Sequence, residues 1–236
     1  MSLPVVILAG GLATRLRPIT EKIPKSLVDV AGEPFICRQL KYLQAQGIKK
    51  VTLCVGYLGE MIEATVGDGS QFGVEVTYSS DGPILLGTGG AIKQALPLLS
   101  EHFFVLYGDS FLPINFSKVE SAFVASQRPA LMTILKNEDK WDKSNVTYLD
   151  NELVEYNKES PSLDMNYIDY GLGVLSASLF HSYEEGMSFD LSEIYNALSI
   201  KSELKGYPVF QRFYEIGSHI GLKEAEHFFI TKGKEI

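Results

Sequence analysis

Cysteine, basic charge and long apolar runs are scarce in this sequence, and each scarcity excludes a class of protein. The two cysteines, Cys37 and Cys54, lie within apolar patterns, so we expect reduced, buried thiols in a cytoplasmic protein, not a disulfide framework. No apolar run reaches the roughly 18 residues of a membrane-spanning helix, and Met1–Pro4 carries no basic targeting region. The 21 Lys and Arg are outnumbered by 29 Asp and Glu, a net charge of −8, which disfavours nucleic acid and anionic membranes as partners.

Metal-binding histidine patterns, internal repeats and linkers are also missing. The four histidines, His102, His181, His219 and His227, have neither metal-ligand spacing nor a nucleophile partner, which argues against a zinc site and a hydrolytic triad. The composition, 45% hydrophobic and 21% charged over 236 residues, is that of a globular protein with ample length for one core. We therefore expect a single domain over residues 1–236.

Short apolar runs alternate with helical patterns in the first part of the chain, residues 1–136. Val5–Ala9 is a continuous apolar run that ends at Gly10-Gly11, as expected of a strand buried on both faces. Similar runs predict strands at 51–55, 74–78, 103–107 and 130–135, and helices are expected from Pro34 to Gly47, around 61–64, over 90–99 and over 117–126. This alternation predicts an α/β fold with a Rossmann-like, mixed but mostly parallel sheet and helices on both faces.

The pattern changes in the second part, residues 137–236. Residues 145–149 and 153–156 flank Asp150-Asn151, a turn signal that predicts an antiparallel hairpin. A strand near 167–175, a helix from Leu191 capped by Asp190 or Ser192, and a last helix after Gly217 are also expected.

The segment with the most chemical information follows the first strand. Gly10-Gly11 places bare backbone N–H groups at the carboxyl edge of the sheet, where open α/β sheets bind ligands. Glycine allows a phosphate to approach such amides closely. Thr14 can donate a hydroxyl, Arg15 a planar fork of donors, and Lys25 a mobile positive charge.

Each of these features has a plain structural explanation when it stands alone. A Gly-Gly pair after a strand usually forms only a turn, and a single Arg or Lys is usually a solvated surface charge. The segment is neither a Walker loop nor a Gly-x-Gly-x-x-Gly motif. The ordered set of strand, Gly-Gly, Thr-Arg-Leu-x-Pro and Pro-Lys is much more specific than its parts.

That ordered set closely resembles the signature Gly-Gly-x-x-Thr-Arg-Leu-x-Pro-x-Thr…Pro-Lys of the sugar-1-phosphate nucleotidylyltransferases, and the resemblance covers almost the whole chain. Residues 86–92 look like the family's second glycine segment, which lies against base and ribose. Residues 107–110 resemble the Gly-Asp step whose aspartate binds the catalytic metal, and 214–217 stand where the second metal carboxylate is found. Lys158 and residues 168–171 match the segments that contact the sugar phosphate and the sugar.

The resemblance implies a role for each matched residue. It makes residues 1–136 the nucleotide-binding half, and 137–236 an added antiparallel, sugar-binding half that carries the second metal ligand. Its nucleotide-binding residues are Leu8, Ala9, Gly10, Gly11, Thr14, Gly82, Gly87 and Thr88. Its sugar-phosphate residues are Asn157, Lys158, Asp169 and Gly171, its catalytic residues Arg15 and Lys25, and its Mg²⁺ ligands Asp109 and Glu215.

The two proposed metal ligands also have a rationale in their own sequence context. Asp109 ends an apolar strand, and Glu215 ends the alternating run Val209–Tyr214. Alone, Asp109 is as well explained as a turn former, and Glu215 as an exposed charge at a strand end. Together they offer the oxygen ligands that Mg²⁺ takes alongside phosphates.

Four positions depart from the family pattern. Asn157 replaces the usual glutamate and Asp169 the usual asparagine, which either preserves the sugar contacts with the charge moved or marks a different sugar. Glu215 is one methylene longer than the expected aspartate. Gly82 stands where thymidylyl- and uridylyl-type relatives often carry a base-reading glutamine, which disfavours a pyrimidine.

We therefore expect an enzyme that condenses a nucleoside triphosphate, preferably GTP, with a mannose- or heptose-type sugar 1-phosphate and releases pyrophosphate. Uridylyl or cytidylyl transfer to another sugar 1-phosphate is the first alternative. A glycosyltransferase that consumes a nucleotide sugar and a silent nucleotide-binding regulator are the others. The expected partners are the two small substrates, and the resemblance leaves a homo-oligomer open.

Overall fold

The core of the protein is a twisted mixed sheet. The computed structural model describes residues 2–137 and 140–232. Nine described strands form this sheet: β1 (Val5–Leu8), β4 (Lys50–Val55), β5 (Glu75–Ser80), β6 (His102–Tyr107), β8 (Ala130–Lys136), β9 (Val146–Leu149), β10 (Glu152–Tyr156), β11 (Tyr167–Ser176) and β12 (Leu204–Val209). β5, β4, β1, β6 and β11 are neighbours in that order, β8 and then β12 follow, and the β9–β10 hairpin joins β11 at Tyr167.

The strand directions confirm the predicted fold class. β1 pairs in parallel with β4 and β6, β4 with β5, and β8 with β12. β11 is antiparallel to both β6 and β8. The sheet is therefore mixed and mostly parallel, and strands from both parts of the sequence share it. No helix within the described ranges has the length and apolar composition that crossing a membrane requires.

Helices cover both faces of this sheet. The helices on these faces are α1 (Phe35–Ala45), α2 (Gly59–Val66), α3 (Gly87–Ala95), α4 (Phe116–Ser126) and α5 (Leu191–Ile200), whereas α6 (His219–Thr231) lies apart from them. α1, α2 and α4 pack in one apolar cluster with Val5 and Ile7, whereas α3 and α5 pack with Val6 in the cluster on the other face. Successive side chains of β1 therefore point into two different buried layers, which explains why the strand is apolar throughout.

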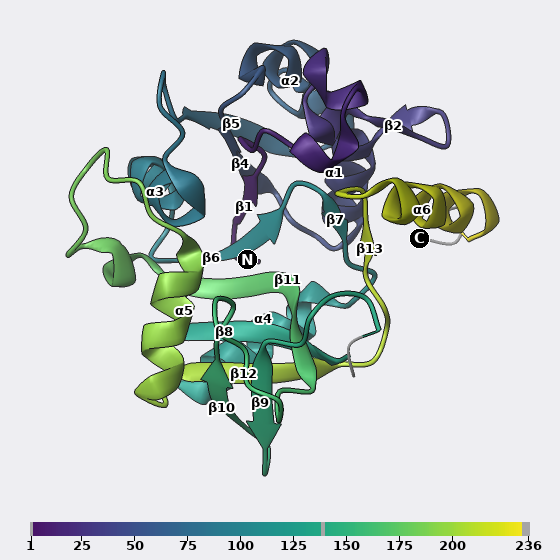
Figure 1. The fold of residues 1–236 in the computed structure, drawn as a ribbon. Coiled ribbons are helices and arrows are strands. Elements are labelled where there is room, and N and C mark those ends of the chain that lie inside the picture. Colours follow the sequence, from purple (N-terminus) through teal and green to yellow (C-terminus); the bar gives the residue numbers. More distant parts are fainter. Residues whose placement is uncertain (1, 138–139, 233–236) are drawn as a thin grey trace.

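A third apolar cluster fixes α6 at the side of the molecule. Two short strand pairs, β2 (Asp29–Val30) with β3 (Glu33–Pro34) and β7 (Ser110–Phe111) with β13 (Tyr214–Glu215), lie outside the main sheet. Phe228 and Phe229 of α6 pack against Phe111 of β7 and Phe35 of α1. Figure 1 shows α6 beside β13 and β7, with α3 and α5 on the opposite side of the picture.

The local sequence signals explain several element boundaries. Asp150 and Asn151 both adopt positive φ, 49° and 64°, as the predicted tight hairpin between β9 and β10 requires. α3 begins at Gly87, earlier than expected, and ends at Ala95 because a 3₁₀ turn containing Pro97 follows. The alternating run 209–214 is divided: β12 ends at Val209, and β13 begins only at Tyr214.

The glycines of α3 allow close packing against the segment that precedes α5. Phe189 O accepts hydrogen bonds from the N–H groups of Gly89 (3.0 Å) and Gly90 (3.3 Å), and Phe189 N–H donates to Leu86 O (3.0 Å). A Cβ on Gly89 would overlap the Phe189 ring, and one on Gly90 would overlap Met187 O. These glycines therefore serve the packing of residues 187–189 against α3.

We expect Gly90→Ala to lower the free energy of unfolding by about 1–3 kcal/mol, because the added methyl group must displace backbone. Gly11→Ala is the control, since a Cβ at Gly11 would meet no atom within 4 Å. Urea unfolding followed by circular dichroism measures both variants. Equal stability of the Gly90 variant and the wild type would show that residues 187–189 do not pack against α3 as described.

Candidate active site

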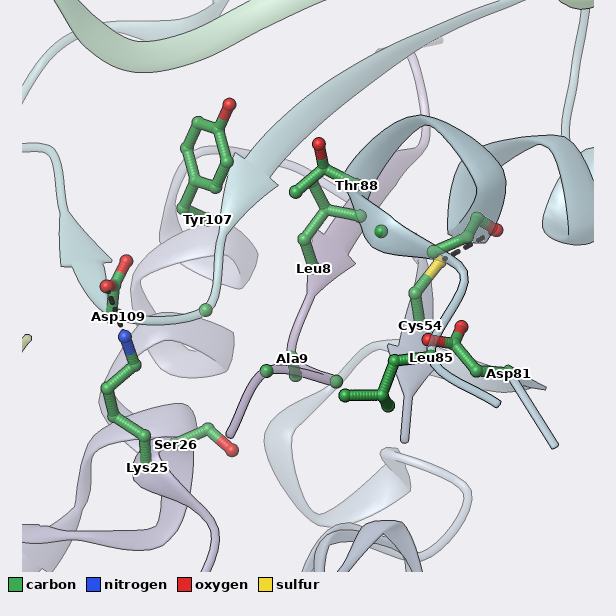
Figure 2. A pocket seen from close by; sticks show the side chains of 15 residues that line it. Leu8, Ala9, Lys25, Ser26, Cys54, Asp81, Leu85, Thr88, Tyr107 and Asp109 are labelled. Carbon is green, nitrogen blue, oxygen red and sulfur yellow. Dashed lines mark hydrogen bonds and ion pairs between the residues drawn. The ribbon is translucent and has the colours of Figure 1, made fainter. Parts of the chain in front are cut away.

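The residues that follow the parallel strands enclose one pocket. Leu8 is in register with Cys54 of β4 and Tyr107 of β6, so the carboxyl ends of these strands meet at one edge of the sheet. There a cavity of about 260 Å³ opens, lined by Leu8, Ala9, Gly10, Gly11, Lys25, Ser26, Cys54, Asp81, Leu85, Gly87, Thr88, Ala91, Tyr107, Gly108 and Asp109. Figure 2 shows Lys25 and Asp109 on one side of this pocket and Cys54, Leu85 and Asp81 on the other.

The pocket brings together about half of the residues that the sequence predicts for the site. The predicted residues in its lining are Leu8, Ala9, Gly10, Gly11, Lys25, Gly87, Thr88 and Asp109. Sequence reasoning assigned no role to Ser26, Cys54, Asp81, Leu85 or Tyr107, which line it as well. Cys54, Asp81 and Tyr107 lie at or just after the carboxyl ends of β4, β5 and β6. Because ligands bind at this edge of an α/β sheet, their positions could have identified them as pocket residues.

The loop after β1 presents backbone donors without protein partners. Ala9 N–H donates to Cys54 O (2.9 Å), but the N–H groups of residues 10–14 donate to no other described residue. Close packing holds this loop, because a Cβ on Gly10 would lie 3.1 Å from the Gly56 nitrogen and one on Gly56 would lie 2.8 Å from Gly10 O. A row of unpaired amides at a strand end is a binding place for an anion.

Lys25 and Asp109 form an ion pair at one end of the pocket. Lys25 belongs to the 3₁₀ turn Lys25–Leu27, and its Nζ lies 2.6 Å from Asp109 Oδ2. Asp109 approaches because Gly108 has no side chain: a Cβ there would lie 2.8 Å from Leu8 O. The structure therefore brings these two predicted site residues together, and their direct ion pair was not predicted.

Gln39 of α1 holds the turn that carries Asp109. It is only 2% exposed, and its Nε2 donates to Tyr107 O (3.0 Å) and Ser110 O (2.8 Å), on either side of Gly108-Asp109. Sequence reasoning missed this residue. The available signal was a lone amide at helical spacing among the buried apolar residues Phe35, Ile36 and Leu43.

Glu215 lies beside Asp109 because β13 pairs with β7. Glu215 is opposite Ser110, and Ile216 N–H donates to Asp109 O (2.9 Å). A Cβ on Gly217 would lie 2.8 Å from Glu215 Oε2, 3.2 Å from Asp109 Oδ2 and 3.3 Å from Arg15 Nη2. The two carboxylates and the guanidinium therefore surround one small space.

The two carboxylates provide the type of donor that a magnesium ion requires, while in this structure the Lys25 ammonium is paired with Asp109 Oδ2. The donors are hard carboxylate oxygens, which Mg²⁺ takes from one or two protein groups while phosphates and water complete the shell. Among the described residues no cluster of three or more His, Cys, Asp and Glu side chains is found, so Asp109 and Glu215 would act as a pair. Their assignment as magnesium ligands stays a prediction.

The extra methylene of Glu215 lets its carboxylate also contact the start of α6. Ser218, the N-cap of α6, donates from Oγ to Glu215 Oε1 (2.6 Å), and Gly217 N–H donates to Oε2. A Cβ on Gly221 would overlap Oε1. The carboxylate is therefore held by the two residues that precede α6.

Three of the predicted nucleotide and catalytic residues lie outside the pocket lining. Thr14 and Arg15 belong to an exposed 3₁₀ turn, Thr14–Leu16, with Arg15 reaching the space beside Gly217. Gly82 has a φ of 77° and forms the turn after Asp81, and its N–H donates to Ser80 Oγ (3.2 Å). The predicted contacts of these residues with a nucleotide remain predictions.

The four predicted sugar-phosphate residues also lie beyond the lining of this pocket. Asn157 Oδ1 accepts from Ser160 N–H (2.9 Å), and Lys158 Nζ lies 3.3 Å from Oδ2 of Asp190, the N-cap of α5. In β11, Asp169 Oδ1 accepts from the N–H of Gly171 (2.9 Å), whose φ is 103°.

Asp169 connects this group to the pocket. Burial raises its pKa to about 6, although the Gly171 N–H and Lys158 act in the opposite direction. Burial and then the Asp169 charge raise the pKa of Tyr107 and Tyr195, so the carboxylate lies within electrostatic reach of Tyr107 at the pocket wall. A carboxylate that is partly removed from water needs hydrogen-bond donors, and sugar hydroxyls are suitable donors.

We expect Asp169→Asn to stabilise the protein at pH 8 by about 1–3 kcal/mol. The folded pKa, about 6, lies above the ordinary value of 3.8, so ionisation destabilises the fold as pH rises from about 4 and does so fully above pH 6. The asparagine Oδ1 can still accept from Gly171. Differential scanning calorimetry from pH 8 to pH 5 should show the gain shrinking as the pH falls, and a gain independent of pH would contradict the raised pKa.

The sequence and structure have clear relatives. Residues 4–229 match the Nucleotidyl transferase family. A D-glycero-alpha-D-manno-heptose 1-phosphate guanylyltransferase from Campylobacter jejuni is 32% identical over 202 residues, which are 84% of this chain and 88% of that protein. An N-acetylmuramate alpha-1-phosphate uridylyltransferase from Neisseria meningitidis is 31% identical over 229 residues, 94% of this chain and 96% of that protein.

A solved structure supports the same relationship. HddC from Yersinia pseudotuberculosis, complexed with GMP-PN, is similar with a TM-score of 0.79 and 25% identity, over 96% of this chain and 99% of that one. Sequence and fold agree over nearly the full length, and the resemblance predicted from the glycine, Thr-Arg and Pro-Lys motifs is confirmed. The chain belongs to the nucleotidyl transferase family.

Proposed function

We propose that this protein transfers a guanylyl group from GTP to a mannose- or heptose-type sugar 1-phosphate. The observation that carries the proposal is the row of unpartnered amides at residues 10–14 beside the Lys25–Asp109 pair. An oxygen of the sugar phosphate attacks the α-phosphorus of GTP, the bond from that phosphorus to the β-phosphate oxygen breaks, and pyrophosphate leaves. Such a reaction needs mainly positioning and charge stabilisation.

The residues around the Lys25–Asp109 pair share the positioning and the charge stabilisation of the phosphates. The amides of residues 10–14 cradle the triphosphate, and Arg15 contacts its β- and γ-phosphates. Lys25 stabilises the negative charge on the α-phosphate. Magnesium held by Asp109 and Glu215 would supply further charge neutralisation at the reacting phosphates. In the sugar-binding half, Lys158 binds the phosphate of the acceptor, and Asp169, Gly171 and Asn157 contact the sugar.

Asp81 supports guanine as the base. It lies at the end of the pocket away from Lys25 (Figure 2), and burial raises its pKa. Its Oδ2 accepts from Leu86 N–H (3.2 Å), whereas Oδ1 has no hydrogen-bond partner among the described residues. Guanine presents adjacent N1–H and N2–H donors that a carboxylate can accept together. Uracil and thymine would instead place a carbonyl oxygen against the carboxylate, so they are disfavoured.

The relatives support the same choice of substrates without deciding it. Both the Campylobacter jejuni protein and the Yersinia pseudotuberculosis complex point to a guanine nucleotide. The Neisseria meningitidis uridylyltransferase keeps uridylyl transfer as the alternative. Asp169, as a half-buried acceptor within electrostatic reach of Lys158, is suited to the hydroxyl-rich ring of a hexose or heptose 1-phosphate.

The test of base and sugar is a panel of GTP, UTP, CTP and dTTP against mannose, heptose, glucose and N-acetylmuramate 1-phosphates, with pyrophosphate release as the readout. We expect the highest kcat/KM with GTP and a manno-configured sugar. Asp81→Asn should lower kcat/KM for GTP about ten- to a hundredfold and affect UTP less, because asparagine replaces one acceptor by a donor.

The guanylyl assignment fails if GTP is no better than the pyrimidine nucleotides with every sugar. Release of nucleoside diphosphate from a nucleotide sugar would instead indicate a glycosyltransferase. Tight nucleotide binding without turnover across the panel would indicate a regulator.

Lys25→Ala and Asp109→Ala should each reduce kcat about a hundred- to a thousandfold or more, because each removes charge stabilisation at the transferred phosphate. Lys41→Ala is the matched control, since Lys41 is an exposed lysine whose ion pair with Glu33 lies outside the pocket lining. Steady-state kinetics and circular dichroism of the purified variants provide the comparison. Turnover of either pocket variant close to that of the Lys41 variant would remove the assigned role.

A further inference from the structure

Gln39 joins α1 to both ends of the turn that carries Asp109. Its Nε2 donates to Tyr107 O (3.0 Å) and to Ser110 O (2.8 Å), which lie on either side of Gly108 and Asp109. Because both partners are carbonyl oxygens, only the NH2 end of the amide can face them. One side chain of the helix therefore fixes where this turn enters and leaves.

The hydrogen bond to Ser110 also affects the position of Glu215. Ser110 begins β7 and is in register with Glu215 of β13. The residue after Glu215, Ile216, donates from its N–H to Asp109 O (2.9 Å). The position of Ser110 therefore determines where Glu215 lies relative to Asp109, and Gln39 holds Ser110 from the helix.

Packing alone does not explain an amide at this position. Gln39 is 2% exposed, and its Oε1 accepts no hydrogen bond from any described residue. Its neighbours on the same buried face of α1, Ile36, Leu40 and Leu43, are apolar. A buried polar atom without a partner lowers stability, so an apolar side chain would suit these surroundings better. The contribution of the glutamine is therefore the pair of hydrogen bonds that it donates to the turn.

We propose that Gln39 is a positioning residue for the metal: it sets the spacing of the Asp109 and Glu215 carboxylates at which both bind the magnesium ion of the magnesium-nucleotide complex. The inference rests on the proposed function, since it requires that complex in this pocket. Gln39 itself touches neither metal nor nucleotide. Replacing a residue that orients metal ligands in this way typically weakens metal binding about ten- to a hundredfold.

The test compares Gln39→Met with Gln46→Met. Methionine is an unbranched side chain of similar length that fills the space but lacks the two donors. Gln46 is the C-cap of the same helix, and its Oε1 accepts from Phe116 N–H (3.2 Å), in a contact outside the pocket lining. If circular dichroism shows that Gln39→Met does not fold, Gln39→Glu is measured in its place, because it keeps the shape and removes the amide donors.

Calorimetric titration measures Kd for GTP twice, once with excess magnesium and once with EDTA. The ratio of the two values is the gain in nucleotide affinity that magnesium provides. If the wild type binds another of the four triphosphates better, that nucleotide is used. A purely structural role of Gln39 would change both Kd values alike, whereas a positioning role changes the gain from magnesium.

Gln39→Met should reduce the gain from magnesium about ten- to a hundredfold and leave Kd in EDTA unchanged. Gln46→Met should leave both values unchanged, and Asp109→Ala, which removes a ligand outright, sets the largest loss expected. An unchanged gain for Gln39→Met, or an equal rise of its Kd with and without magnesium, overturns the inference alone. A wild type whose affinity does not depend on magnesium overturns the assignment of the metal ligands and the inference with it. Failure of the wild type to bind any of the four triphosphates overturns the proposed function as well.

Discussion

The parallel pairing of β1 with β4 on one side and β6 on the other is the constraint on which the site depends. It brings three chain segments out of the sheet at one edge, so that the loop after Leu8, the end of β4 and Asp109 surround the same cavity. If β6 ran antiparallel to β1, Asp109 would lie at the opposite edge, far from the amides of residues 10–14. The register is fixed by packing, because Val5 and Ile7 belong to one buried layer and Val6 to the other, and a slip of one residue would exchange them.

Much of this architecture could be predicted from local sequence. Apolar runs with no polar alternation identified the inner strands, and Asp150-Asn151 identified the hairpin because both residues tolerate the positive φ that the turn needs. The convergence of Lys25, Asp109 and Glu215 was also predicted, although they are far apart in the sequence. That prediction came from the ordered motifs, since neither composition nor periodicity contains the pairing of β13 with β7.

The remaining features depend on neighbours that the local sequence does not specify. Gln39 has the helical spacing of a core residue. Its amide has hydrogen-bond acceptors only because the turn between β6 and β7 packs against α1. Asp81 is a common residue type at a strand end, and the role proposed for it depends on a carboxylate oxygen that has no partner among the described residues in the folded pocket. Gly89 matches a motif expected near the ribose, yet it accommodates the Phe189 ring, because packing against a distant segment also selects glycine.

The start of α5 connects the cavity with Lys158. Thr88 forms part of the cavity wall, and its Oγ1 accepts from the N–H of Leu191 (2.7 Å). The preceding residue, Asp190, pairs with Lys158 (3.3 Å). Residues 190 and 191, at the start of α5, therefore connect Thr88 in the cavity wall with Lys158, so the two groups of predicted site residues are joined by hydrogen bonds and an ion pair across neighbouring residues.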